Sequence, residues 1–496
     1  MSGIFYGLEI ARRGLTVSQQ AITLTGNNIS NASTEGYTRQ RLVIDSIYPD
    51  TKNRFAGTVT IGGGAEVSFI DQVRSDYVDR QLRDEYAALG QWGTRSEELE
   101  FIESIMNETS ESGTISAALA DFYDSLSSLT TNPGNTEIRT NLQQNGIKLC
   151  ETLNYYADQL TDLQNSYNTA MGTTVDKIND LTDSIASYNE EIYAYELNGQ
   201  KANELRDKRN TLLDELSQLV NIDYSEDAKG KLTVSVEGVN LVSHTSVTKL
   251  EAVADQTGVV SGEPGFYSIY LEGTTDEFQY SSGKLQAYKD LRDGNSADNM
   301  GIPYMLSNLN TLAQSLAEEF NTVHNAGYTI PYSGGTSQTG VDFFKVPAGG
   351  YSAITAGNFA LSDEVLENVN NIAASGAVVD LTASDTQTGN NENALKLYAL
   401  TSSTKLGTVG NFDNFLKSFV VQVGIASAGA QETAESQTSI VNNLETRKES
   451  ISGVSIDEEV INLISYQYAY AAASRTLTAI DEALDVLINR TGRVGL

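Results

Sequence analysis

The chain has 496 residues and carries 32 Lys and Arg against 65 Asp and Glu, which gives a formal net charge of −33. This acidic balance excludes nucleic acid and an anionic membrane surface as partners, because both are bound through clustered Lys and Arg. With one cysteine, Cys150, and two histidines, His244 and His324, the chain cannot form a disulfide framework and offers little material for catalysis, so we expect no cofactor and no metal.

The first residues do not have the pattern of a cleavable export signal. Glu9 interrupts the apolar stretch, and Arg12 and Arg13 follow that stretch instead of preceding it. No apolar run reaches about 18 residues, the length that a membrane span needs. The composition by itself therefore favours a cytoplasmic protein, or one that is exported by a route without a cleavable signal.

Both ends of the chain show coiled-coil spacing, in which apolar or small residues recur alternately four and three positions apart. The stripe at the N-terminal end includes Ile4, Leu8, Leu15 and Ile22. The stripe at the C-terminal end includes Leu463, Gln467, Tyr470, Leu477 and Leu484. An isolated helix with so dilute a stripe is marginal in water, so we predict that the two terminal helices pair with each other.

Between the ends, the first half of the chain is mostly helical. Residues 41–70 alternate like short strands, and residues 71–107 return to helical spacing. A shorter helix is expected over 113–130, ended by the turn Asn132-Pro133-Gly134. The longest periodic stretch follows, with one stutter between Thr174 and Ile178. Residues 136–220 therefore predict an antiparallel helical hairpin.

The second half alternates in character. Strands are expected at 231–236, 247–253, 266–273 and 276–282, and a helix over 302–323, with Pro303 in its first turn. A stretch rich in Gly, Ser and Thr follows, and helical spacing then resumes and leads to the C-terminal helix.

These elements predict a multidomain α+β protein, with paired terminal coiled-coil helices, a long helical-bundle rod domain and inserted β-rich middle domains. The expected domains are a terminal coiled-coil domain (1–40 plus 450–496), a helical rod domain (41–221, 300–326 and 392–449), a β-rich domain (222–299) and a small mixed domain (327–391).

Few residues present themselves as catalytic or metal-binding. His244 lies in a strand-like segment, and His324 lies in the last turn of its helix, where a cation would complement the helix dipole. Asp223-x-Ser225-x-Asp227 starts like a calcium loop but lacks the required glycine and final glutamate, so we interpret it as a hairpin turn. Cys150 follows Leu149, a residue of the apolar stripe in 136–220, and is expected to be packed rather than reactive.

The most informative segment is NNISNASTEGYTR, residues 27–39. Asn, Ser and Thr compete with the helical backbone, and Gly36 can supply a positive φ, so the segment is typical of a helix end followed by a turn. Spacing alone does not separate such a cap and turn from a functional element.

This segment resembles the N-terminal signature of the bacterial flagellar rod, hook and hook-associated protein family. The stretch SGVSIDEEVINLISYQYAYAAASRTLTAIDEALDVLIN, from Ser452, is similar to the terminal helix of the same family. The two motifs cover about ninety residues. The long helices of 71–220 resemble the hook-associated members more than the β-rich hook and rod proteins.

The resemblance implies a non-enzymatic structural subunit of the flagellum, secreted through the flagellar type III apparatus and assembled at the junction between hook and filament. The implied partners are identical subunits in a ring, hook protein, a second hook–filament junction protein, and a secretion chaperone on the C-terminal helix. Two alternatives stay open: another axial subunit, such as hook protein or a flagellin-like protein, and an enzyme that uses acidic residues within 222–391.

The resemblance also assigns roles to residues at both ends. It implies that the bend out of the N-terminal helix is shaped by Asn28, Ile29, Asn31, Thr34, Gly36, Tyr37 and Arg39. Contacts along the C-terminal helix are implied for Asn462, Leu463, Gln467, Tyr470, Arg475 and Leu484. Glu35 departs from the small residue or proline of the family pattern.

Overall fold

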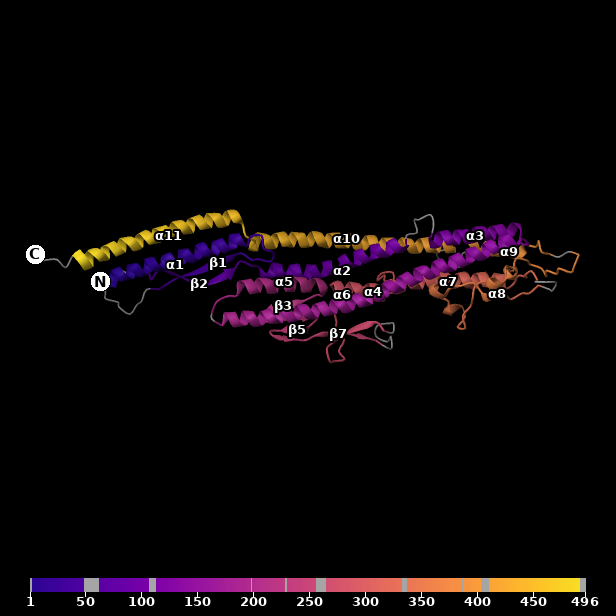
Figure 1. The fold of residues 1–496 in the computed structure, drawn as a ribbon, viewed down its shortest axis with the longest axis horizontal. Helices are drawn as coiled ribbons and strands as arrows, with labels where there is room; N and C mark the ends of the chain where they lie inside the picture. Colours follow the sequence, from indigo (N-terminus) through magenta and orange to yellow (C-terminus); the bar gives the residue numbers. More distant parts are fainter. Residues whose placement is uncertain are drawn as a thin grey trace, which may run out of the picture.

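The computed structural model describes residues 2–48, 62–106, 113–197, 199–227, 230–255, 265–331, 337–384, 387–402 and 410–490. These residues form an elongated rod of long helices, and both ends of the chain lie at the same tip of the rod (Figure 1). The expected α+β class is confirmed, since the long helices carry only small antiparallel sheets.

The terminal helices pair, as predicted. α1 (Ser2–Ser30) and α11 (Ile456–Asp485) run side by side in opposite directions (Figure 1). Small residues allow close approach: a Cβ at Gly7 would lie 3.4 Å from Cδ1 of Ile480, and a Cβ at Gly14 would lie 3.8 Å from Cβ of Ala473. The hairpin of β1 (Gln40–Ser46) and β2 (Ala65–Gln72) packs against α1, and a π-helical turn (Val486–Arg490) follows α11.

The rod is built on α4 (Thr136–Glu196), whose 61 residues span roughly 90 Å. Asn135 caps this helix by accepting hydrogen bonds from two backbone N–H groups. The predicted hairpin with α5 (Asn203–Leu219) is confirmed. The remaining long helices of the rod are α2 (Asp76–Met106), α3 (Ile115–Thr131), α7 (Ile302–His324) and α10 (Phe412–Ser452).

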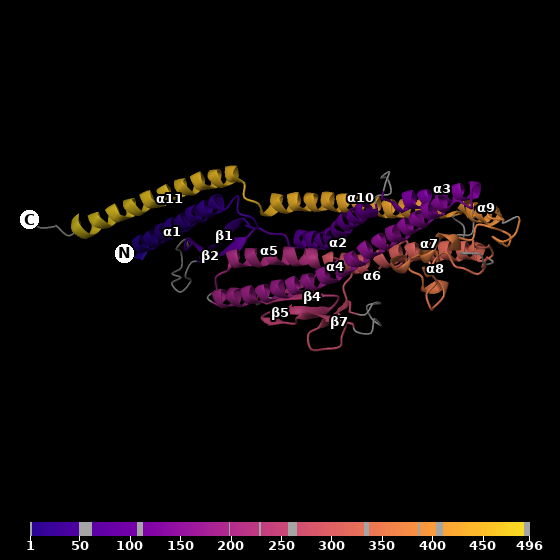
Figure 2. The same cartoon turned by 45° about the vertical axis from the view of Figure 1, so that its right-hand side comes forward.

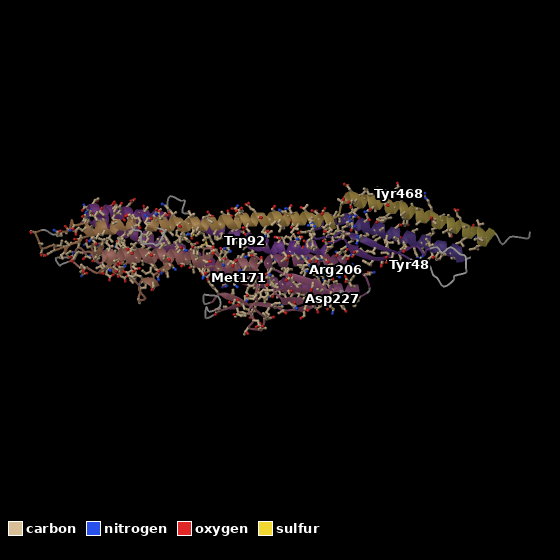
Figure 3. The ribbon with its side chains drawn as sticks, turned by 180° about the vertical axis from the view of Figure 1, so that it is seen from behind. Tyr48, Trp92, Met171, Arg206, Asp227 and Tyr468 are labelled. Atoms are coloured by element: carbon tan, nitrogen blue, oxygen red, sulfur yellow. The ribbon has the colours of Figure 1, made fainter. Side chains whose placement is uncertain are left out.

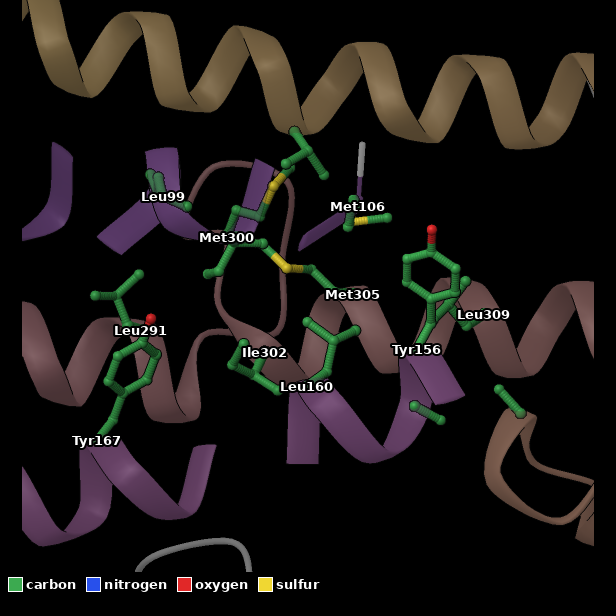
Figure 4. Packing of buried hydrophobic residues seen from close by; sticks show 14 of the residues in the cluster. Leu99, Met106, Tyr156, Leu160, Tyr167, Leu291, Met300, Ile302, Met305 and Leu309 are labelled. Carbon is green, nitrogen blue, oxygen red and sulfur yellow. The ribbon is translucent and has the colours of Figure 1, made fainter. Parts of the chain in front are cut away.

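Most of the apolar stripe predicted for α4 is buried, whereas Tyr195 near the end of the helix is 50% exposed. Leu160 lies beside Met300, Ile302 and Met305, and Tyr167 lies toward Leu291 (Figure 4). Thr174 and Ile178, on the two sides of the stutter, are also buried. The stripe therefore fixes which side of the helix faces the core.

Two small sheets lie on one side of α4 (Figure 2). The first has the order β3 (Asp223–Glu226), β4 (Leu232–Val236), β5 (Val239–Ser243) and β6 (Ser246–Val247), and the second joins β7 (Leu250–Ala254) to β8 (Tyr267–Leu271). Alternate residues of β4 are buried, as its sequence predicts.

The strand expected at 276–282 is wrong. The structure has only an isolated bridge there, between Tyr270 and Glu277, and helix α6 (Lys284–Asp293) begins soon after. Phe278 and Tyr280 caused the error, because their alternation is typical of a strand. Their rings instead stack with centroids 5.9 Å apart, and Phe278 is buried in the core.

Residues between α7 and α10 form short helices around an aromatic cluster. These are η2 (Tyr351–Ala353), η3 (Ala356–Asn358), α8 (Asp363–Glu367), η4 (Val369–Asn371), α9 (Glu392–Ala399) and η5 (Leu400–Ser402). Phe320, Phe343, Phe344 and Phe359 are all buried beneath them. This cluster closes the end of the rod that lies away from the chain termini (Figure 1).

Candidate functional site: the joint between the terminal helices and the rod

Asn28 lies at the centre of the joint, near the end of α1, and is 2% exposed. Its Nδ2 donates to the carbonyl of Gln40 at 2.9 Å and to Oε2 of Glu459 at 3.1 Å. Its Oδ1 accepts from the hydroxyl of Tyr37 at 2.8 Å and from the N–H of Gln40 at 3.2 Å. Both donors and both acceptor sites of the amide are thus used, which orients the chain as it leaves α1.

Glu459 joins the two terminal helices to the start of β1. This carboxylate in the first turn of α11 is 3% exposed and accepts from Nε of Arg39 at 2.9 Å in addition to the Asn28 amide. Arg39 also donates from Nη1 to Glu458 at 3.2 Å, and its backbone N–H donates to the carbonyl of Ser452 at 2.8 Å. One side chain therefore holds the end of α1, the following turn and the start of α11 together.

Asp207 of α5 ties the same turn to the rod. Its carboxylate accepts from the N–H of Thr38 at 3.1 Å, from the Thr38 hydroxyl at 2.7 Å, and from Nε2 of Gln72 at 2.8 Å. Burial raises the pKa of Asp207, and the hydrogen bonds from Thr38 and Gln72 oppose that rise. The guanidinium of Arg74 lies 3.8 Å away.

The turn itself has the expected glycine conformation. Gly36 has φ of 75°, and a Cβ there would lie 2.6 Å from the hydroxyl of Thr211. Asn31 donates from Nδ2 to the carbonyl and the side chain of Asn27 at 3.0 and 2.7 Å, and accepts from Thr34 at 3.3 Å. Ile29 is half-buried, and Thr34 and Glu35 are exposed.

A polar cleft of about 610 Å³ lies beside this turn. It is bounded by residues 32–39, by α5 and by the segment where α10 passes into α11. On its wall Asp214 accepts from Arg83 at 2.7 Å and from Lys448 at 3.0 Å. The cleft therefore lies where the terminal pair and the rod meet.

The predicted assembly residues of the terminal helices divide into two groups. Seven are partly buried: Leu8, Leu15, Ile22, Asn462, Leu463, Leu477 and Leu484. Gln467, Tyr470 and Arg475 are exposed, and the side chain of Ile4 lies outside the described residues.

The side of α11 that faces away from α1 carries an exposed apolar stripe. We call it the outer stripe and define it as Ile456, Val460, Ile461, Ile464 and Tyr468. These side chains are between 40% and 75% exposed, and Figure 3 shows Tyr468 pointing outward from α11. So large an apolar surface on one helix is typical of a surface that another protein covers.

His324 is a packing residue, as expected, but it is not a cation. It is fully buried, and its Nδ1 donates to the carbonyl of Val341 at 2.6 Å while Nε2 accepts from the N–H of Ala373 at 2.8 Å. Burial lowers its pKa to about 4. The dipole argument was therefore wrong, because burial outweighs the end of the helix.

This histidine predicts an acid-sensitive core. Above about pH 6.5 the imidazole is neutral in both states, and between pH 6.5 and 4 only the unfolded chain takes up the proton. We expect the free energy of unfolding to fall by up to about 3 kcal/mol across this range. Urea unfolding followed at several pH values measures it. His324→Gln should remove this part of the pH dependence and His244→Gln should leave it, so an equal slope in all three proteins would contradict the prediction.

The other chemical candidates are structural. His244 does not lie in a strand as expected: it has φ of 58°, in the turn between β5 and β6. Asp223 lies in β3, which pairs with β4 through the expected hairpin. Cys150 is buried, and burial raises the pKa of its thiol. Across the described residues, no group of His, Cys, Asp and Glu side chains is placed to hold a metal ion.

Several residues of the joint could not be found from the sequence. Gln40 and Gln72 are ordinary polar residues at strand ends, Thr38 lies in the turn before β1, and Asp207 lies inside a helix far along the chain. Glu459 is one of three acids in the first turn of α11. The sequence has no signal that tells which of these polar residues is buried.

Comparison with known proteins identifies the family. Residues 99–344 match the model of the flagellar hook-associated protein FlgK helical domain, residues 8–38 that of the flagella basal body rod protein, and residues 449–490 that of the flagellar basal body rod FlgEFG protein C-terminal segment.

Whole-length relatives agree with these matches. The chain is 31% identical to flagellar hook-associated protein 1 of Bacillus subtilis, with 99% of both chains covered, and 25% identical to that of Escherichia coli, with 97% of this chain and 98% of the relative covered. The flagellar hook junction protein FlgK of Burkholderia pseudomallei has the same fold, with a TM-score of 0.60 at 16% identity, over 75% of this chain and all of that one.

None of the described helices is both long and apolar enough to cross a membrane. The resemblance seen in the two terminal motifs is confirmed over the whole length. The chain therefore belongs to the flagellar hook-associated protein 1 family, exported structural proteins of the hook–filament junction of the bacterial flagellum.

Proposed function

We propose that this chain is the subunit from which the first layer between hook and filament is built. Its lateral partners are copies of itself, and its axial partners are hook protein on one side and a second hook–filament junction protein on the other. The observation that carries the proposal is the outer stripe of α11. Exposure of five apolar side chains to water is unfavourable, and burial of these side chains against a neighbouring subunit removes that free-energy cost.

The same stripe supports a dedicated chaperone before export. A helix pair with an uncovered apolar face tends to associate unspecifically, and a secretion chaperone on α11 prevents this until the chain passes through the type III apparatus. The chaperone and the neighbouring subunit therefore bind the outer stripe one after the other, so release of the chaperone is coupled to incorporation of the subunit.

The expected division into domains fits this role. We propose that the terminal domain (1–40 plus 450–496) makes the assembly contacts and that the helical rod domain (41–221, 300–326 and 392–449) supports it. The β-rich domain (222–299) and the small mixed domain (327–391) serve as outer surface modules without catalytic activity. Hydrolysis of a peptide or glycan by the purified full chain would contradict the last point.

A single charge in the outer stripe should prevent assembly. Ile464 is 46% exposed, so Ile464→Asp should change the free energy of unfolding by no more than about 0.5 kcal/mol. The same substitution places a charge in the proposed contact between subunits, from which assembly excludes water. We expect a strain that carries this variant to keep its hooks, to secrete unattached flagellin and to lose motility.

Thr476→Asp is the matched control, because it adds the same charge at an exposed position of α11 outside the stripe. Motility assays, electron microscopy of hooks and an assay of flagellin in the medium measure the outcome. Normal filaments in the Ile464→Asp strain would contradict the proposed assembly surface. Deletion of the gene separates the alternatives, since loss of a hook subunit removes the hooks and loss of the junction does not.

A further inference from the structure

A groove on the other side of the terminal pair faces away from α11. It has a volume of about 940 Å³ and lies between α1, the strand β2 and the segment that joins α4 to α5. Its lining is mixed: Gln20, Thr23 and Leu24 come from α1, Phe69 from β2, and Tyr195 and Lys201 from the joining segment. A groove with such a mixed lining is suited to a helix that presents a row of apolar side chains.

The groove and the outer stripe lie on opposite faces of the terminal pair. Asn28 and Gly14 mark the side of α1 that meets α11. On the helical period of 3.6 residues, the groove residues Gln19 and Thr23 lie roughly opposite that side. The same period places the outer stripe roughly opposite Glu459 and Ala473, which meet α1.

Groove and stripe also match in length and in position along the pair. The stripe runs from Ile456 to Tyr468, about 18 Å of helix, and the part of α1 that lines the groove runs from Thr16 to Asn27, about 17 Å. The antiparallel register, in which Gly14 meets Ala473 and Asn28 meets Glu459, places the two surfaces at the same height. When a second copy is placed beside the first by rotation about an axis parallel to the helix pair, the stripe of one copy faces the groove of the other.

Charge at the two surfaces does not oppose this contact. Lys201 lines the groove, where its ammonium pairs with Asp71 at 2.7 Å and lies over the Phe69 ring. Asp457 lies in the first turn of α11, at one end of the stripe.

We propose that the outer stripe of one copy docks into the α1 groove of the next copy. This inference rests on the proposed function and specifies the lateral contact between subunits. The two surfaces are different and lie on opposite faces of the terminal pair, so the contact is heterologous. Each copy donates its stripe and receives another, and repetition yields a ring or a helical layer instead of a closed dimer. A stripe-to-stripe contact would end growth at two copies.

Intermolecular crosslinking tests the contact. The register places Ile464 at the height of Thr23, so Thr23→Cys and Ile464→Cys in one chain should crosslink between copies when isolated hook–filament structures are treated with a short bismaleimide. The two positions lie on opposite faces of the pair, so they cannot crosslink within one chain. Cys150 is buried and stays silent. We expect a ladder of dimers, trimers and larger species.

Two controls make the result decisive. Arg12→Cys with Ile464→Cys keeps the same face of α1 but moves the cysteine by about 16 Å along the helix, and should yield less than a tenth of the ladder. Ile464→Cys alone should stay monomeric. Dimers of that single variant would overturn the proposal in favour of a stripe-to-stripe contact, and crosslinks to a protein of another mass would overturn it in favour of a different occupant.

Immunoblots of the same preparations separate this inference from the proposed function. A subunit that is present in hook–filament structures but forms no ladder overturns the docking contact and leaves the function standing. A wild-type subunit that is absent from these structures, while filaments assemble normally, overturns the function and the contact together.

Discussion

Glu459→Ala should loosen the contact between the two terminal helices at the joint. The substitution removes the acceptor of both Asn28 and Arg39 and leaves the buried Asn28 amide one bond short. Because Glu459 is 3% exposed, we expect a loss of about 3 kcal/mol from the stability of the pair. Hydrogen exchange should show residues of α1 and α11 losing protection while α4 keeps its own.

Glu458→Ala is the matched control, since the side chain of Glu458 is 63% exposed and holds only one amino group of the same arginine. It should change stability by less than about 0.5 kcal/mol. Glu459→Gln should fall between the two, because its amide oxygen can still accept. Equal effects of the Glu458 and Glu459 substitutions would show that the joint does not depend on the buried carboxylate.

Phe122→Ala should loosen the opposite end of the rod. The Phe122 ring has no exposed surface, and its centroid lies 5.5 Å from that of Phe320, 5.8 Å from Phe343 and 6.0 Å from Phe344. Truncation removes the apolar ring and its tilted contacts with three other rings, so we expect a loss of about 3–5 kcal/mol.

Urea unfolding measures this loss as a lower midpoint. Tyr155→Ala serves as the control, because Tyr155 is an aromatic residue on the neighbouring helix α4 with 58% exposure. A change below about 1 kcal/mol in the Phe122 variant would mean that the cavity collapses, or that this end of the rod unfolds separately from the rest.

The long helices could be predicted from the sequence because their signal is repeated many times. Most turns of α4 place a large apolar residue on one side, and each of these residues independently indicates the same helix face. The pairing of α1 with α11 followed from a weaker argument, that neither stripe can bury itself, and it was correct because each helix had few other partners.

The exposed state of Gln467 has a simple geometric reason. The expected stripe on α11 followed a strict coiled-coil repeat of 3.5 residues, whereas a straight helix has 3.6 residues per turn and drifts away from that repeat. The side of α11 that meets α1 therefore includes Ala473 and Ile480, while Gln467 has rotated into solvent.

The joint could not be predicted beyond its turn. Its central carboxylates belong to helices separated from the motif by much of the chain: Thr38 and Asp207 are 169 positions apart, and Asn28 and Glu459 are 431 apart. A buried acid has no local pattern, since its burial depends on which donors the tertiary structure brings to it. His324 is a similar case, because only the packed fold shows that both ring nitrogens are bonded.

The position of both chain ends at one tip has a consequence for how a subunit is completed. α1 is the first helix of the chain and α11 is the last long one, so the partner of the first thirty residues is synthesised and threaded through any export channel only at the very end. A chain cut short before Ser455 leaves α1 packed against the β1–β2 hairpin without its long helical partner, and leaves the joint without Glu459. Only a chain that includes α11 can form the helix pair.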